Sequence, residues 1–172
     1  MNPIYLRSAT LGDLPTMSAI IQSAKELLKN DNIDQWQDGY PNLAQSRADV
    51  ENKQAYVLMV NQQIGAMATF LTQPDPSYQT LRQGHWQQNG PYATFHRLAV
   101  NPEFRGQHLT NYLMSNLLTL AIQHDLANVR IDTHQDNLRM QHILNNWGFQ
   151  KRGMIELQYQ QGGVRVAYEL NL

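Results

Sequence analysis

The chain contains no cysteine among its 172 residues. That absence excludes disulfide bonds, a thiolate nucleophile and the usual structural zinc sites. No apolar run approaches the ~18 residues that a membrane-spanning helix needs, and the first residues lack the charged and then apolar pattern of a secretory signal. We therefore expect a soluble, cytoplasmic protein without a membrane partner.

Charged residues are also scarce, and the two signs balance. The chain has 13 Lys and Arg against 14 Asp and Glu, a formal net charge of −1, and 16% charged residues in total. This balance gives no general attraction to nucleic acid, so we expect no nucleic-acid partner. Hydrophobic residues make up 42% of the chain, which is enough for a packed core. The length matches one domain of ~100–200 residues, so we predict a single domain over residues 1–172.

Apolar periodicity predicts a mixed α/β order of elements. Apolar residues that recur at intervals of three and four positions predict helices over 10–29, 43–52, 105–125 and 140–147. Short apolar or alternating runs predict strands over 4–7, 55–60, 64–70, 92–100, 129–132, 154–160 and 164–170. The predicted helix near 140–147 ends at Gly148, because glycine readily adopts the left-handed conformation of a helix C-terminus.

Two polar connections carry large aromatic side chains. Trp36 and Tyr40 lie in residues 30–43, and Trp86 lies in the longer connection 72–91. Aromatic residues in such segments line a binding surface or cover the edge of the core, and the sequence leaves both interpretations open. We take all three as candidates for the wall of a substrate pocket. The length of residues 72–91 suggests a functional flap or a flexible segment.

The most informative stretch is a strand, a tight turn and the start of a helix. The strand ends at Val100, the turn is Asn101-Pro102-Glu103-Phe104, and Arg105-Gly106 leads into the helix. Unpaired amide groups in the first turn of a helix attract phosphate oxygens, and Arg105 adds a positive charge. Many such turns bind nothing, so this pattern alone leaves a phosphate site and a plain connection equally open.

The series Leu98-Ala99-Val100-Asn101-Pro102-Glu103-Phe104-Arg105-Gly106, with Asp136-Asn137 and Trp147-Gly148-Phe149 further on, resembles the GNAT superfamily of acetyl-CoA-dependent N-acetyltransferases. The resemblance implies a three-layer αβα fold around a twisted mixed, mostly antiparallel sheet of about seven strands with about four helices. It implies acetyl-CoA as cosubstrate and direct transfer of the acetyl group to a primary amine. The acceptor would be a small-molecule amine or a peptide amine, and the protein a monomer or homodimer.

The resemblance also implies which residues bind acetyl-CoA. The turn would hold the pyrophosphate through Arg105, Gly106, Gln107, His108, Leu109 and Thr110. The pantetheine arm would pair with the backbone of Leu98, Ala99 and Val100 at a splay in the sheet, and Asn137 would reach the same cofactor.

Three residues depart from the family pattern. His108 stands where the family prefers glycine, and Thr110 where it prefers glycine or alanine. Leu144 occupies the position of the family's usual acid, a tyrosine. These departures keep open an alternative function, a non-catalytic acyl-CoA-binding or regulatory module.

The candidate catalytic residues are His96, His134 and Tyr159. His96 resembles the histidine that a member of this family has at that strand position, and an imidazole can accept a proton near neutral pH. Without the resemblance, a structural histidine is the simpler interpretation. His134 is a second base or a substrate contact, and water or Tyr159 would protonate the leaving thiolate. Thr94 shares the face of His96 and is a candidate for a water-mediated relay, while Arg97 faces the other way toward a carboxylate.

Asp132 and Asp136 flank His134, and this spacing raises the question of a metal site. One imidazole with two carboxylates has some ligand chemistry, but the local sequence places no second imidazole beside them. We therefore expect no metal cofactor.

Overall fold

Seven strands form one sheet in the order β1-β2-β3-β4-β5-β7-β6 in the computed structural model, which describes residues 3–158 and 163–172. The strands are β1 (Ile4–Ser8), β2 (Ala55–Val60), β3 (Gln63–Leu71), β4 (Ala93–Val100), β5 (Asn128–His134), β6 (Gln150–Glu156) and β7 (Val164–Asn171). The α-helices of the described residues are α1 (Leu14–Asn30), α2 (Leu43–Glu51), α3 (Leu109–Gln123) and α4 (Leu138–Asn146). Pairing is antiparallel for β1 with β2, β2 with β3, and β7 with β5 and β6, and it is parallel for β4 with β5. The predicted mixed α/β fold is therefore confirmed.

The chain divides into two compact units. Unit 1 contains Met1–Leu71 and Phe95–Leu120, and unit 2 contains Thr72–Thr94 and Ala121–Leu172. The boundary falls within β4, so the first two residues of that strand belong to unit 2 and the rest to unit 1.

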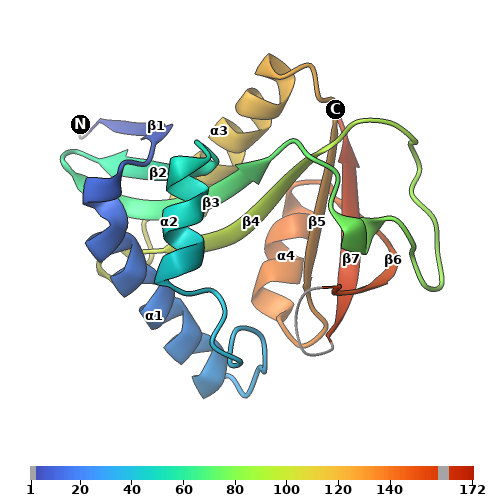
Figure 1. Ribbon diagram of the computed structural model, residues 1–172, viewed down its shortest axis with the longest axis horizontal. Helices are drawn as coiled ribbons and strands as arrows, with labels where there is room; N and C mark the ends of the chain where they lie inside the picture. Colours follow the sequence, from blue (N-terminus) through green and yellow to red (C-terminus); the bar gives the residue numbers. More distant parts are fainter. Residues whose placement is uncertain (1–2, 159–162) are drawn as a thin grey trace. The chain divides into compact units, whose positions relative to one another are not determined.

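In unit 1, α1 and α2 pack on one face of β2 and β3 (Figure 1). Their shared core consists of apolar side chains from both helices and both strands. Its main members are Leu14, Met17, Ile20, Ile21, Val50, Val57, Met59, Ile64 and Met67. The spacing of the α1 members is the three-and-four repeat on which the predicted helix rested.

The opposite face of the same strands contacts α3. Gly65 follows Ile64, so its missing side chain would point away from the core under α1 and α2. A Cβ atom at Gly65 would lie 2.6 Å from Cδ1 of Leu109 and 2.8 Å from Cγ2 of Val60. Any other residue at this position would force the Leu109 or Val60 side chain to shift.

In unit 2, the two faces of β7 contact different partners. The Tyr168 hydroxyl and Oε1 of Gln141 on α4 are 3.1 Å apart, which places α4 on one face of the strand. The neighbouring Ala167 belongs to a second buried cluster on the other face, together with Tyr78, Tyr92, Ile155 and Leu157. Unit 2 thus has its own core, to which the connection between β3 and β4 contributes.

This long connection, residues 72–91, is packed along β6 and is not extended away from the sheet. Arg82 and Met154 exchange backbone hydrogen bonds of 2.7 and 2.9 Å. Nε1 of Trp86 donates to the Tyr78 carbonyl at 2.8 Å. A Cβ atom at Gly84 would lie 1.7 Å from the Arg152 carbonyl oxygen, so only glycine fits beside the β6 backbone.

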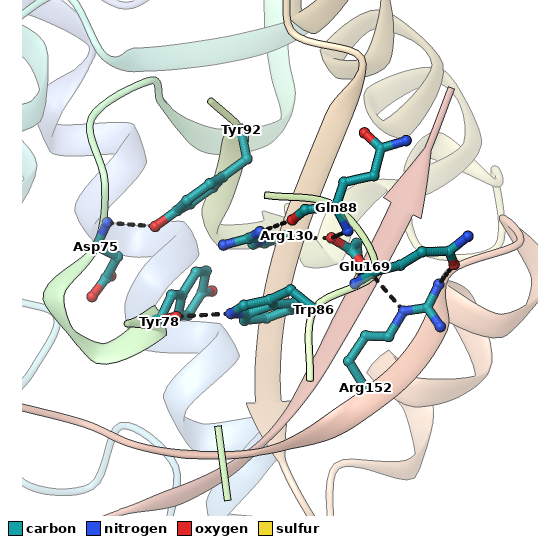
Figure 2. A network of polar contacts seen from close by, with 9 residues as sticks. Asp75, Tyr78, Trp86, Gln88, Tyr92, Arg130, Arg152 and Glu169 are labelled. Atoms are coloured by element: carbon teal, nitrogen blue, oxygen red, sulfur yellow. Dashed lines mark hydrogen bonds and ion pairs between the residues drawn. The ribbon is translucent and has the colours of Figure 1, made fainter. Parts of the chain in front are cut away.

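A buried polar network fixes the same connection to β5 and β7 (Figure 2). The Glu169 side chain is fully buried and accepts hydrogen bonds from the Gln87 amide at 2.7 Å and from Nε of Arg152 at 3.0 Å. The guanidinium carbon of Arg130 lies 4.2 Å from the ring centroids of both Trp86 and Tyr92. Burial lowers the pKa of Arg130 and raises the pKa of Tyr92.

A second ion pair, in unit 1, caps the short 3-10 turn Leu11–Asp13 that leads into α1. Asp13 accepts two hydrogen bonds of 2.8 Å from Arg7 and one of 2.7 Å from the Thr10 amide. This is the capping arrangement expected from the spacing of Thr10 and Asp13. The hydrogen bonds from Arg7 are the main reason that the pKa of Asp13 lies well below its usual range.

We expect Asp13→Asn to lower the free energy of unfolding by about 1–2 kcal/mol at pH 7, because it weakens both the cap and the ion pair. A depressed folded-state pKa stabilises the fold above the unfolded pKa of about 3.9, and this contribution is lost as the pH falls. The difference between wild type and variant should therefore stay constant from pH 7 to about 5 and shrink below pH ~4. Urea unfolding across that range measures it, and a difference that persists unchanged at pH 2 would contradict the assignment.

None of the described helices is long and apolar enough to cross a membrane. The structure differs from the predicted elements mainly at β6, which begins at Gln150 and not at Met154. Its first residues are polar because they are largely exposed, and a register shift between Lys151 and Gly153 interrupts the alternation.

Candidate cofactor and catalytic site

The turn between β4 and α3 contains two residues with a left-handed backbone conformation. Gly106 has a φ of 81° and His108 a φ of 53°, both in the left-handed region. Histidine is among the non-glycine residues found there most often, so His108 can adopt this conformation. Its side chain is exposed, as are those of Arg105 and Gln107.

Asn101 connects this turn to β3. Its side chain donates to the Ile64 carbonyl at 2.9 Å and its amide donates to the Gly65 carbonyl at 2.8 Å. Its side-chain oxygen also accepts from the Glu103 amide at 3.1 Å, at the start of a short 3-10 turn, Pro102–Phe104. The amide groups at the start of α3 are therefore presented from a fixed turn, directly after the strand that carries Leu98 to Val100.

A Cβ atom at Gly106 would meet no other atom within 4 Å, so the turn has open space beside it. The first residues of α3, Leu109 and Thr110, offer their amide groups at the positive end of a 15-residue helix. An exposed guanidinium, Arg105, lies in the same turn. The residues present thus fit a phosphate-containing group such as the pyrophosphate of acetyl-CoA.

Along β4, buried and half-buried side chains alternate. Phe95, Arg97 and Ala99 are buried, whereas His96, Leu98 and Val100 are half-buried. The expectation that Arg97 faces away from His96 and pairs with a carboxylate is confirmed: Nε of Arg97 lies 2.7 Å from Oδ2 of Asp49.

The other predicted catalytic residues, and Asn137 among the predicted cofactor contacts, lie outside β4. His134 ends β5, and its Nδ1 accepts from the Asp136 amide at 3.2 Å and lies 3.7 Å from the Asp136 carboxylate. Asn137 is the N-cap of α4, where its side-chain oxygen accepts from the Met140 amide at 3.1 Å. Tyr159 lies outside the described residues.

The aromatic candidates are held by neighbouring residues. Trp36 packs against the core of unit 1, and the Tyr40 hydroxyl accepts a hydrogen bond from Nη1 of Arg97. Trp86 packs against the core of unit 2. Thr94 is fully buried, and its hydroxyl has no hydrogen-bond partner among the described residues.

The structure also shows a polar contact that sequence reasoning missed. The Tyr78 hydroxyl donates to Oδ2 of Asp132 at 2.8 Å, although the two residues are 54 positions apart. The only local signal was the position of Asp132 near His134, which raised the question of a metal. Asp49 carried no local signal at all, because its partner Arg97 lies 48 residues away.

Comparison with known proteins identifies the family of this chain. The model of the acetyltransferase (GNAT) family matches residues 21–149, which include the turn and both halves of β4. The chain belongs to the GNAT family. Comparison with curated protein sequences gives no match.

Solved GNAT structures cover nearly the whole chain. A GNAT-family acetyltransferase of Streptococcus agalactiae is 31% identical, with a TM-score of 0.90 over 98% of this chain and 95% of that one. The yncA protein of Salmonella typhimurium, solved with its cofactor acetyl-CoA, is 15% identical, with a TM-score of 0.68 over 98% and 94%. The ribosomal-protein-S18-alanine N-acetyltransferase of Escherichia coli is 16% identical, with a TM-score of 0.66 over 98% and 94%. The last two show likeness of fold only.

Proposed function

We propose that this GNAT protein transfers the acetyl group of acetyl-CoA to a primary amine by direct attack in a ternary complex. The observation that carries the proposal is the turn from Arg105 to His108, whose left-handed Gly106 and His108 lead into the N-terminus of α3. Such a turn presents amide groups to a diphosphate. The family match spans parts of both units, which supports one N-acetyltransferase domain over residues 1–172.

The cofactor would be held by backbone more than by side chains. Its pyrophosphate would bind at Arg105, Gly106, Gln107, His108, Leu109 and Thr110. Its pantetheine arm would pair with Leu98, Ala99 and Val100, and Asn137 would add a contact. Bound in this way, acetyl-CoA supplies an activated acyl group as a thioester.

In the proposed reaction, this chain removes a proton and stabilises an oxyanion. A lysine-like amine, with a pKa of ~10.4, is almost wholly protonated at pH 7, so a base must help it to become a nucleophile. We assign that role to His96, with His134 as the second candidate. A backbone amide near Val100 would donate to the developing oxyanion. Water or Tyr159 would protonate the departing thiolate.

Trp36 and Tyr40, both half-buried in unit 1, are the residues that we propose as contacts of the acceptor. Trp86 stays a prediction from the sequence, whereas the full burial of Thr94 leaves its side chain no surface for an acceptor to touch. A small-molecule amine and a peptide amine are the two acceptor classes that we propose. The name of the Escherichia coli structure, an S18-alanine N-acetyltransferase, illustrates the peptide class within this fold. The balanced charge of this chain disfavours a strongly charged polymer as acceptor.

A non-catalytic acyl-CoA-binding module is the alternative. The fully buried Leu144 favours it, because a tyrosine at this position is the family's usual acid and leucine cannot donate a proton. Binding of acetyl-CoA without turnover of any amine would support this alternative.

One experiment tests the proposed function. Acetyl-CoA at 100 times its Kd should stabilise the protein by about 2.7 kcal/mol, which a thermal shift detects. The same protein is then screened against small amines, amino acids and short peptides, with release of free thiol from acetyl-CoA as the readout. We expect binding, and turnover of at least one amine class. Absence of binding would contradict the proposal, and binding without turnover would leave the alternative.

We expect His108→Gly to tighten acetyl-CoA binding about three- to tenfold, because glycine permits closer approach of phosphate to a left-handed turn. Isothermal titration measures the Kd. His124→Gly is the matched control, since His124 is an exposed histidine in the turn after α3 and lies outside the proposed cofactor site. This control should leave the Kd unchanged, whereas weaker binding by His108→Gly would show that the imidazole contacts the cofactor.

A further inference from the structure

Arg97 interrupts the extended backbone of β4 directly before the segment proposed to bind pantetheine. Its φ is 53°, a left-handed conformation that is strained for a non-glycine residue. The Arg97 side chain is only 7% exposed although it carries a charge. A buried charged residue in a strained conformation persists only where surrounding contacts hold it.

Asp49, on α2, supplies the main contact. Nε of Arg97 donates to Oδ2 of Asp49 at 2.7 Å, and Nη2 donates to Oδ1 at 3.0 Å. The Asp49 side chain, 5% exposed, also accepts from the Thr69 hydroxyl and from Nε2 of Gln45, both at 2.9 Å. A bidentate guanidinium–carboxylate pair fixes orientation as well as distance, so the pair locks Arg97 to α2.

The same guanidinium also contacts the connection between α1 and α2. Nη1 of Arg97 donates to the Tyr40 hydroxyl, and the guanidinium carbon lies 5.8 Å from the Tyr40 ring centroid. Tyr40 is one of the residues proposed to contact the acceptor. One buried side chain therefore joins the proposed cofactor strand to the proposed acceptor segment, and all of these residues belong to unit 1.

We propose that Arg97 is a positioning residue for acetyl transfer: through Asp49 it holds β4 in the shape that presents Leu98 to Val100 to the cofactor, and through Tyr40 it holds the acceptor segment. This inference rests on the proposed function. Arg97 touches no reacting group. Its effect is on the geometry of the backbone that binds the thioester arm and on the place of the Tyr40 ring.

The test uses Asp49→Asn, which keeps the shape of the side chain and removes its charge. Isothermal titration of the full chain should show the Kd for acetyl-CoA raised at least tenfold. Hydrogen exchange should show the amides of residues 97–100 exchanging at least tenfold faster without any cofactor. Asp13→Asn is the matched control, because it breaks the other bidentate Arg–Asp pair of unit 1. The control should leave both quantities within twofold of wild type.

Tyr40→Phe removes the hydrogen bond between Arg97 and Tyr40 and keeps the pair of Arg97 with Asp49. It also provides the test if Asp49→Asn does not fold. It should raise the KM for the amine turned over best in the acceptor screen about fivefold, with the Kd for acetyl-CoA unchanged. If the contact between Arg97 and Tyr40 were merely structural, Tyr40→Phe would not change the amine KM while leaving the Kd for acetyl-CoA unchanged. Unchanged exchange at residues 97–100 in Asp49→Asn, or an unchanged amine KM in Tyr40→Phe, would overturn the inference. Failure of the wild-type protein to bind acetyl-CoA would instead overturn the proposed function, and the exchange measurement remains valid in that case.

Discussion

Glu169→Gln is expected to lower the free energy of unfolding by about 3–5 kcal/mol, which is the cost of removing one partner from a buried ion pair. Nε of Arg130 lies 3.6 Å from Oε1 of Glu169, and Nε of Arg152 lies 3.0 Å from Oε2. Glutamine keeps the shape of the side chain but leaves the buried Arg130 without its counter-charge. Burial already lowers the pKa of Arg130, and Glu169 opposes that shift.

Thermal and urea unfolding measure this effect. For a chain of this size, the melting temperature should fall by roughly 6–20 °C, at about 2–4 °C per kcal/mol. Glu156→Gln is the matched control, because Glu156 pairs with Arg82 on the surface of β6 with 49% of its side chain exposed. An exposed pair contributes about 0–1 kcal/mol. Equal losses from the two variants would show that burial of Glu169 contributes nothing.

The same substitution should detach the connection between β3 and β4. Glu169 accepts hydrogen bonds from the amides of Gln87 and Gln88, at 2.7 and 3.5 Å, and Arg130 donates to the Gln88 carbonyl at 2.6 Å. Without the carboxylate these contacts weaken together, so the amides of residues 86–88 should lose protection from hydrogen exchange. The segment predicted as a flap or a flexible connection is thus held by a charge at the far end of the chain.

Local sequence signals predicted the elements but not their long-range partners. The apolar repeat of α1 and the apolar run of β2 identify both elements, because each depends on residues close in sequence. The contacts of Glu169 with Gln87 and of Arg97 with Asp49 span 82 and 48 residues. Alternation along β4 predicted the face on which Arg97 lies, and the positive charge of Arg97 predicted a carboxylate partner. Only the tertiary structure shows which carboxylate that is.

The turn before α3 follows a local sequence pattern, whereas the candidate catalytic groups do not. Glycine and histidine both adopt a left-handed φ more readily than most residues, so Gly106 and His108 are local signals of this turn. Catalytic groups come from separate elements, and no local pattern brings them together. The hydrogen bond between Tyr78 and Asp132 shows how far apart in sequence such partners can lie, since 54 positions separate them.

His96→Gln is expected to lower kcat about 10²- to 10⁴-fold, the usual contribution of a general base, and to leave the Kd for acetyl-CoA within about twofold. Glutamine keeps a polar side chain of similar size but cannot accept the proton of an ammonium group. The loss should be greatest at pH values where the wild-type enzyme is active. Release of free thiol from acetyl-CoA, measured from pH 6 to 9 with the best amine of the acceptor screen, gives kcat and KM separately.

Three further variants complete this test: one is a control, one examines the second candidate base and one examines the candidate acid. His142→Gln is the control, because His142 lies on the exposed side of α4, where Nε2 contacts Asn146 at 2.9 Å, and it should leave kcat unchanged. His134→Gln tests the second candidate base, and Tyr159→Phe tests the candidate acid. Full activity of His96→Gln with a large loss in His134→Gln would transfer the role of base to the end of β5. Full activity of both would mean that this chain relies on the acceptor's own neutral fraction, which rises tenfold per pH unit below the amine pKa.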